Sequence, residues 1–318
     1  MPPSSPMAGT GSAHHDLASA LTAWSVGPFG VAVALAVVAA GVWYLRAATR
    51  VRAKGRHWGP GRTSAFLAGL LTIELALGSF VATWSMGSFA YHIWQHLLLM
   101  VVAPPLLALG APSTLLLQTA PKPVRSAWLR VLHSTPFAVL THPVVVWFLY
   151  YGAMFAFFLS PALGFAMTHM DVMDLWNIGF FVGAACFWWP MVGLDPIPRW
   201  RMGYGMRFIN LLIGVPFESF LGIALLTLTS PVAPMYTLDS THLGAGILWA
   251  ATELFTVAAL VPIFVQWSRA DTRQARRDDA RLDAAALAGT APVAAAEGPD
   301  PARMRGLAAT FAAIRREA

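Results

Sequence analysis

The sequence has little of two things that most soluble proteins use, cysteine and charge. Cys186 is the single cysteine, which excludes an intramolecular disulfide framework and a metal site built on a cysteine pair. Charged residues make up 11% of the chain, against about 25% in an ordinary soluble domain. The sequence also lacks a nucleophile elbow, a phosphate-binding loop and an HExxH motif, so it gives no support for the enzyme classes that these motifs mark. We therefore expect a protein that is not an enzyme.

Hydrophobic residues make up 57% of the chain and gather in long runs. Each run has roughly the twenty residues that an α-helix needs to cross about 30 Å of hydrocarbon. Between Arg62 and Lys122 the one charged residue is Glu74, so two of these runs lie in lipid almost without charge. The sequence thus predicts an all-α, polytopic membrane helix bundle with about seven transmembrane helices. The predicted spans are residues 26–45, 63–83, 91–109, 143–160, 175–194, 208–229 and 243–267.

Lys and Arg are confined to alternate gaps between these spans. All 21 lie in residues 46–62, 122–130, 199–207 and 269–316. Cytoplasmic loops keep such cations because moving them across a bilayer opposes their hydration and the membrane potential. We therefore expect the N-terminus outside and the C-terminus in the cytoplasm. Since the cations are spread over separate loops, they indicate topology and contact with anionic lipid rather than with nucleic acid. No Lys or Arg precedes the first span, which argues against a cleavable signal peptide.

Composition divides the chain into three parts. Residues 1–22 are rich in Pro, Ser, Gly, Ala and His, and we expect a disordered extracytoplasmic segment. Residues 23–268 form the predicted membrane domain, in which residues 112–135 alternate cations with apolar groups at helical spacing. That pattern predicts a helix lying in the cytoplasmic interface. Residues 269–318 form a cytoplasmic tail that is first charged, then Ala/Pro-rich, and ends in a short amphipathic piece at 302–316.

Histidine and methionine gather on the predicted outer side. His92 and His96 are one helical turn apart on one face of the third span. Because that face lies near the aqueous boundary, we expect replacement of the pair to leave the helices below largely undisturbed. Imidazole together with thioether is the ligand set that selects copper, and Cu(I) favours the sulfur. Helix packing or interfacial hydrogen bonding is the alternative role for such a pair. The candidate metal ligands are His92, His96, His169, His242, Met170 and Met173.

Three acidic residues, Glu74, Glu218 and Glu253, lie inside predicted spans. A charge at bilayer depth costs about 2.5–3.5 kcal/mol on insertion scales, so such residues usually have partners or a function. One interpretation is a protonated carboxyl group that is hydrogen-bonded between helices. The other is a proton path or support for a metal. On the cytoplasmic side, we expect His142 to be structural and Asp195 to cap the turn that it begins.

Several separated motifs resemble those of one family. They are His92-Ile93-Trp94-Gln95-His96, Ala103-Pro104-Pro105, Gly110-Ala111-Pro112, Thr141-His142-Pro143, Phe187-Trp188-Trp189-Pro190, Gly193-Leu194-Asp195-Pro196, and Gly244-Ala245-Gly246 with Trp249. In this order, over about residues 60–268, the chain resembles the multi-pass CtaG-type cytochrome c oxidase assembly factors. The resemblance implies a multi-pass protein of the bacterial plasma membrane that helps to mature a haem–copper oxidase, with oxidase subunits and the lipid bilayer as partners. Of the candidate ligands, His92 and His96 match the family residue by residue.

Three hypotheses about function follow. The leading one is an assembly factor that places or retains copper for the oxidase at the extracytoplasmic face, and is a chaperone rather than an enzyme. The second is a haem-binding or electron-transfer membrane protein, in which two of the outer histidines are axial ligands. The third is a scaffold that binds no metal and contacts nascent oxidase subunits.

Overall fold

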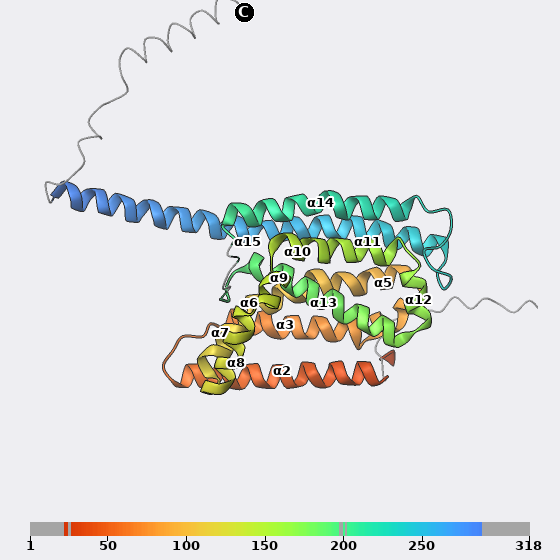
Figure 1. The fold of residues 1–318 in the computed structure, drawn as a ribbon, viewed down its shortest axis with the longest axis horizontal. Helices are drawn as coiled ribbons and strands as arrows, with labels where there is room; N and C mark the ends of the chain where they lie inside the picture. Colours follow the sequence, from red (N-terminus) through yellow and green to blue (C-terminus); the bar gives the residue numbers. More distant parts are fainter. Residues whose placement is uncertain (1–21, 25–26, 197–199, 201, 288–318) are drawn as a thin grey trace, which may run out of the picture. The chain divides into compact units, whose positions relative to one another are not determined.

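The computed structural model describes residues 22–24, 27–196, 200 and 202–287, and its regular elements are all helical within those residues (Figure 1). The predicted all-α class is therefore confirmed. Two of the elements, η1 and η2, are π-helices. The elements are α2 (Pro28–Ala53), α3 (Pro60–Leu77), α4 (Phe80–Ser85), α5 (Phe89–His96), η1 (Leu97–Val102), α6 (Ala103–Leu109), α7 (Pro112–Thr119), α8 (Lys122–His133), α9 (Thr135–Leu140), α10 (Pro143–Trp147), η2 (Phe148–Gly152), α11 (Ala153–Phe158), α12 (Ala162–Thr168), α13 (Met170–Val192), α14 (Tyr204–Leu226) and α15 (Leu238–Leu287).

The described residues contain six helices long and apolar enough to cross a membrane, or seven if one bent pair counts as a span. The six are Pro28–Ala53, Pro60–Ser85, Phe89–Thr119, Met170–Val192, Tyr204–Leu226 and Leu238–Ala285. The bent pair is Pro143–Phe158 with Ala162–Thr168, and its two parts meet at 74°. This pair contains the predicted span 143–160, so the prediction of about seven spans agrees with the larger count. The chain is a multi-pass membrane protein.

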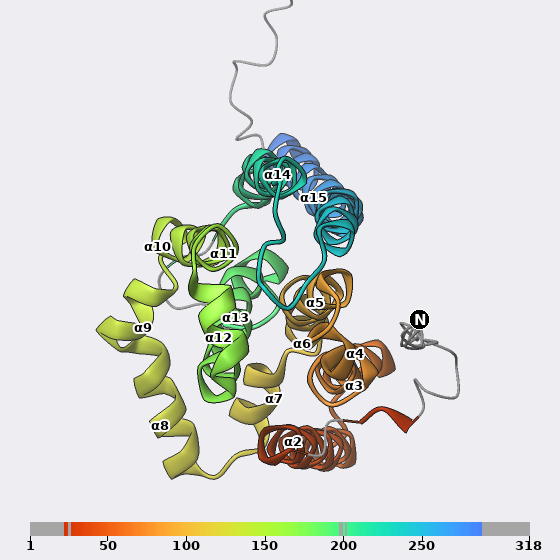
Figure 2. The same cartoon turned by 90° about the vertical axis from the view of Figure 1, so that its right-hand side faces the viewer.

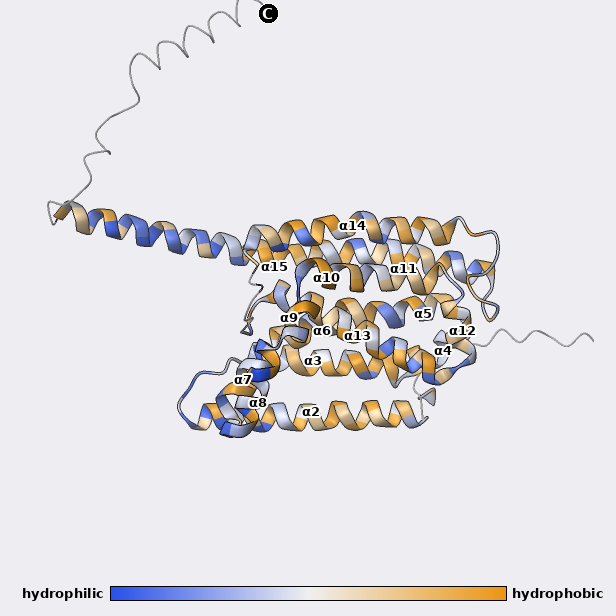
Figure 3. Cartoon of the chain, viewed as in Figure 1, coloured by the Kyte–Doolittle hydropathy of each residue, from blue (hydrophilic) through white to orange (hydrophobic). Residues whose placement is uncertain are grey.

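The helices of residues 27–264 run back and forth between two ends, which we name by their chemistry. At the histidine end, α5, α13 and α15 begin, and α12 lies across the bundle (Figure 1). At the basic end lie the loop before α3 and the amphipathic helix α8, and hydrophilic residues gather there (Figure 3). Seen from the histidine end, α13 occupies the middle of the bundle, while α2 lies at its edge beside α3 (Figure 2).

The amphipathic segment and the tail differ in detail from the sequence predictions. The predicted interfacial helix at 112–135 is divided among α7, α8 and α9, with breaks before Pro121 and at Ser134. Helix α15 continues to Leu287, beyond the predicted span, because residues 269–287 are rich in good helix formers such as Ala and Arg. The chain separates into two compact units, Met1–Phe264 and Val265–Ala318. Residues 1–21 of the predicted disordered segment 1–22 lie outside the described residues, and so does the amphipathic piece at 302–316.

The helix that carries the histidines continues as the π-helix η1, and a pair of prolines follows it. The Ala103 amide donates to the Leu98 carbonyl, five residues back. Pro104 and Pro105 have no amide hydrogen, so neither an α-type nor a π-type backbone bond reaches the Met100 carbonyl. The indole of Trp188 on α13 donates to this carbonyl instead, at 2.9 Å. Two motifs that are far apart in the sequence thus form one structural joint.

Asp195 makes a second long-range joint, at the basic end. Its carboxylate accepts hydrogen bonds from the Ser113 amide (3.0 Å) and from the Thr114 amide (2.7 Å) and hydroxyl (2.6 Å). It therefore caps the first turn of α7. The turn that Asp195 was expected to cap continues into residues 197–199, which lie outside the described residues. Ala111, just before α7, has a left-handed backbone with φ of 49°, and the cap holds the chain in that sharp turn.

Candidate metal site at the histidine end

His92 and His96 form a close pair inside the bundle. Their Nε2 atoms are 3.0 Å apart, and the side chains are 1% and 2% exposed. Phe157, Phe158 and Phe180, from α11 and α13, surround the two rings, with the Phe180 ring 4.8 Å from that of His96. The prediction that replacement of the pair leaves the packed helices largely undisturbed was wrong, because both rings are buried. Aromatic side chains from spans distant in sequence cover the pair, so truncating either ring would leave a cavity.

The electrostatics of the pair leave metal-binding atoms available. At 3.0 Å one Nε2 must donate and the other accept, so the two rings are opposite neutral tautomers. Neither Nδ1 has a hydrogen-bond partner among the described residues. The Nε2 separation is close to the roughly 3.3 Å between two nitrogens that each lie about 2.0 Å from one tetrahedral metal ion. The two Nε2 atoms therefore fit one shared metal ion once the proton between the rings has moved to the Nδ1 of the ring that carries it.

A cavity of about 240 Å³ opens beside His92, and we call it the entrance cavity. Helices α4, α5 and α13 contribute its walls, so side chains far apart in sequence meet there. Met170 is 47% exposed and Met173 is 6% exposed, so the two thioethers reach from the surface into the interior. The polar and sulfur-bearing side chains that line it include Met86, His92, Gln95, Met170, Met173, Asp174 and Asn177.

Two predicted ligands are not brought into this group. His169 is exposed, stacks on Phe165 at 4.1 Å between ring centroids, and its Nδ1 lies 3.0 Å from the Phe165 carbonyl. His242 places its Nε2 3.0 Å from the carbonyl of Leu228. Both rings thus have backbone partners of their own. In the part of the chain that the structure describes, no three His, Cys, Asp or Glu side chains are placed to hold a metal, so a site here needs thioether sulfur.

The walls around the pair are fixed by hydrogen bonds from the loop before α15 and from α15 itself. The Tyr236 hydroxyl donates to the Ser85 carbonyl at 2.8 Å, and the Phe89 amide donates to the Ser240 hydroxyl at 2.8 Å. Burial raises the pKa of Tyr236, so its hydroxyl stays protonated and able to donate at physiological pH. The Gln95 amide donates to the Ala76 carbonyl at 3.0 Å, which ties α5 to α3. These bonds hold His92 against the cavity.

Sequence reasoning missed Asp174 and Asn177 as members of this site. Both follow Met170 and Met173 at helical spacing, so the four share one face of α13. That spacing is the signal that would have found them. The side-chain amide oxygen of Asn177, Oδ1, is buried and has no hydrogen-bond partner among the described residues. It is therefore free to accept a bond from water or from another guest in the cavity.

The three acids inside the spans have different surroundings. Glu253 accepts hydrogen bonds from the Trp249 indole (2.6 Å) and the Ser219 hydroxyl (3.1 Å), as the hydrogen-bonded interpretation predicted. Glu74 and Glu218 each keep one carboxyl oxygen without a partner among the described residues. Glu74 lies in a surface hollow against α2, whereas Glu218 lies deep in the bundle near His96. The acids therefore do not form one continuous path.

The chain was compared with known protein families and with curated proteins. Residues 42–270 match the family described as cytochrome c oxidase caa3 assembly factor (Caa3_CtaG). The chain belongs to this family. The matched region includes the histidine pair, the proline pair with Trp188, and Asp195, so the resemblance stated from the motifs is confirmed. No solved structure matches the chain.

Curated relatives of this Caa3_CtaG family member come from mycobacteria. An uncharacterized protein of Mycobacterium leprae (strain TN) is 31% identical over 278 residues, which is 82% of this chain and 42% of that protein. An uncharacterized protein of Mycobacterium bovis is 30% identical over 285 residues, which is 84% of this chain and 42% of that protein. A protein of Mycobacterium tuberculosis gives the same figures. The chain spans less than half of the length of these relatives.

Proposed function

We propose that this protein is an oxidase assembly factor that receives Cu(I) in the entrance cavity and holds it for a subunit of the oxidase. The observation that carries this proposal is the 3.0 Å histidine pair beside Met170 and Met173 in one cavity. Neutral imidazole and thioether bind Cu(I) well, whereas Mg²⁺ and Ca²⁺ prefer several oxygen ligands. Copper is the cargo here, so the protein needs no catalytic residues.

The charge distribution supports an extracytoplasmic position for this cavity. Lys and Arg in the loop before α3 and in α8 support a cytoplasmic position for the basic end, in a bacterial plasma membrane. The histidine end then faces outward, the N-terminus lies outside and the C-terminus lies inside. The mycobacterial relatives fit a bacterial membrane. Copper would thus be held on the side from which it arrives without crossing the bilayer.

The arrangement suggests how each group acts. Met170 lies at the rim, where it is exposed enough to contact an arriving ion or a client subunit. Met173, His92 and His96 would hold Cu(I) deeper, and the surrounding phenylalanines exclude water, which strengthens each metal–ligand bond by lowering the local dielectric. Release to the oxidase is then a ligand exchange through Met170, with no change in the oxidation state of copper.

The geometry argues against haem bound by this pair. Two axial nitrogens each lie about 2 Å from the iron on opposite faces of the ring, which places them about 4 Å apart with the macrocycle between them. His92 and His96 lie on one face of one helix, and their Nε2 atoms are only 3.0 Å apart. A haem plane does not fit between them without unwinding α5.

The test replaces both ligands while keeping the aromatic packing. We expect the double variant His92→Phe/His96→Phe to remain abundant in the membrane, to lose at least about tenfold in Cu(I) affinity, and to reduce assembled oxidase severalfold in cells grown at limiting copper. Added copper should restore part of the oxidase. The measurements are copper analysis of purified protein and the oxidase content of membranes.

His169→Phe is the matched control, because it removes an exposed histidine at the same end that does not line the cavity. It should bind copper and support oxidase assembly like the natural protein. Normal oxidase in the double variant at limiting copper would replace the copper proposal with the scaffold hypothesis. A Soret band in purified natural protein that the double variant loses would establish the haem hypothesis instead.

A further inference from the structure

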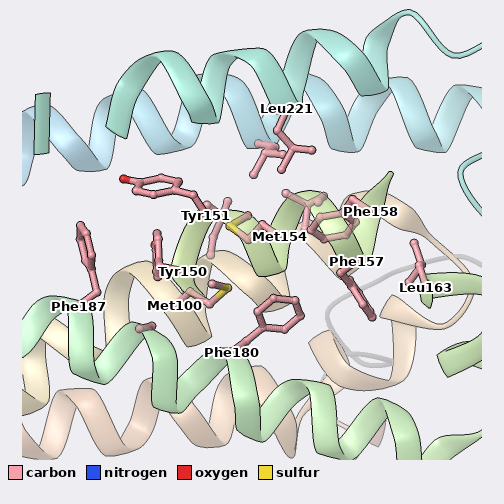
Figure 4. Packing of buried hydrophobic residues seen from close by; sticks show 14 of the residues in the cluster. Met100, Tyr150, Tyr151, Met154, Phe157, Phe158, Leu163, Phe180, Phe187 and Leu221 are labelled. Atoms are coloured by element: carbon pink, nitrogen blue, oxygen red, sulfur yellow. The ribbon is translucent and has the colours of Figure 1, made fainter. Parts of the chain in front are cut away.

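A second, smaller cavity lies on the other side of the histidine pair. This inner cavity is lined by His96, Met100, Tyr150, Met154, Glu218 and Thr252, among others, and has a volume of about 10 Å³. That is room for roughly one water-sized particle. It lies between η1, η2, α11, α14 and α15, within the apolar cluster that Figure 4 shows around Met100 and Met154. The two cavities share no lining residue, and the histidine pair stands between them.

Two polar atoms of the residues that line the inner cavity lack partners. They are Nδ1 of His96 and Oε2 of Glu218, and the structure describes no hydrogen-bond partner for either. His96 is 2% and Glu218 is 8% exposed, so bulk water does not satisfy them. Buried polar atoms without partners are rare in folded proteins, because each loses its hydration without a replacement. A guest in the cavity that bonds to both atoms would remove this cost.

The rest of the wall identifies the guest. Met100 and Met154 are 1% and 6% exposed, and both line the same small space. Figure 4 shows these two side chains between α13 and α14. Two thioethers, one imidazole and one carboxylate combine soft donors with a single negative charge. A soft ion of charge +1 matches both features, since the carboxylate neutralises it in a medium of low dielectric. Water would form hydrogen bonds with the polar atoms but would bind the thioether sulfurs only weakly.

We propose that the inner cavity is a second Cu(I) site, formed by His96, Met100, Met154 and Glu218. This inference deepens the proposed function and rests on it, because copper would arrive from the entrance cavity. His92 lines the entrance cavity, His96 lines the inner one, and their rings touch. Movement inward would be a ligand exchange in which the bonds from Cu(I) to Met173 and His92 break and bonds to Met100, Met154 and Glu218 form, while the carboxyl proton of Glu218, where present, leaves to water. Because a neutral imidazole has one lone pair, His96 would belong to the inner ion when both sites are filled, and His92, Met170 and Met173 would hold the entrance ion. The protein thus holds two copper ions in line, one exposed to the client and one in reserve.

The experiment counts Cu(I) ions on the purified full-length chain in detergent, by competition with a chromogenic Cu(I) chelator. The natural protein should bind two. Met100→Leu/Met154→Leu should bind one, and these substitutions conserve volume well enough for the fold to persist. Glu218→Gln should also bind one. Glu253→Gln is the matched control, because this acid is likewise on a spanning helix but does not line the cavity, and it should bind two.

A variant of the other cavity separates this inference from the proposed function. Met170→Leu/Met173→Leu should retain one ion, and X-ray absorption at the copper edge should show sulfur bound to it. If the natural protein binds one ion that is lost with Met170 and Met173 but not with Met100 and Met154, the inner site is refuted and the proposed function stands. If the single ion is lost with Met100 and Met154 alone, the inner site stands and the entrance site is refuted. Two ions in Met100→Leu/Met154→Leu would also overturn the inner site.

Discussion

The two ends of the bundle treat buried polar groups in opposite ways. At the basic end, Asp195 accepts three hydrogen bonds, and the Tyr44 hydroxyl donates to the Gly110 carbonyl at 2.7 Å while it accepts from Trp58. Toward the histidine end, Nδ1 of both histidines and Oδ1 of the Asn177 side chain have no partner among the described residues. Each unpaired buried group costs about 1–3 kcal/mol.

The difference distinguishes a structural end from a binding end. Burial raises the pKa of Asp195, while hydrogen bonds from Thr114 and Ser113 oppose that rise and hold the side chain in place. Its partners are all supplied by the protein, so the group contributes to stability. The atoms at the histidine end have room beside them in the entrance and inner cavities instead. Substitutions at the basic end should therefore change stability and leave copper binding unchanged. Phe substitutions of the histidine pair, which keep ring volume in place, should change copper binding more than stability.

The largest expected effect on stability is that of Asp195→Ala. It removes the cap of α7 and leaves two backbone amides without an acceptor, so the free energy of unfolding should fall by about 2–4 kcal/mol. Thermal unfolding of the purified protein measures this, and the copper count of the folded fraction should stay at the natural value. Asp195→Asn, which keeps an acceptor, should lose less than half as much. A full loss of copper from folded Asp195→Ala would show that the basic end also takes part in copper binding and is not purely structural.

A smaller effect is expected at two neighbouring tryptophans that differ in the hydrogen-bond partner of the indole nitrogen. Trp188→Phe leaves the Met100 carbonyl without a donor, which should lower the free energy of unfolding by about 1–3 kcal/mol. Trp189→Phe removes an indole nitrogen that has no partner among the described residues, so it should cost less. Thermal unfolding of the two variants measures the difference, which contains the hydrogen bond together with the greater burial of Trp188. Equal losses would mean that the bond to Met100 adds nothing.

The smallest effect is expected for His242→Phe. Its ring has one bond to the Leu228 carbonyl, so the free energy of unfolding should fall by about 0.5–1.5 kcal/mol. The copper count should not change, because His242 does not line either cavity at the pair. Chelator competition on the purified variant tests this. A lost copper ion would restore His242 to the ligand set that the sequence predicted and would extend the binding end to α15.

The sequence predicted the features that depend on local pattern. Hydropathy located the spans, and the spacing of His92 and His96 placed them on one helical face, because both follow from helix geometry alone. It did not predict the burial of the pair under Phe157 and Phe180, which reach it from other spans. The partner of Asp195 lies 82 residues away, so no local signal pointed to it. The predicted span ends at residue 267, before the charged run, whereas the helix α15 continues through that run to Leu287.

The π-helix η1 has a consequence for the direction in which the ligands point. Each residue of an α-helix turns the chain by about 100°, so the one extra residue in a π-turn offsets the angular phase of everything before it by about that amount. His92 and His96 precede this defect, and Pro104 and Pro105 follow it. Deleting one residue within Leu97–Val102 would restore an α-helical phase and swing both imidazoles away from their cavities with every ligand still present. The direction in which the two imidazoles point therefore depends on the π-helix η1. A comparison of the ligand residues alone would not detect the loss of this π-helix.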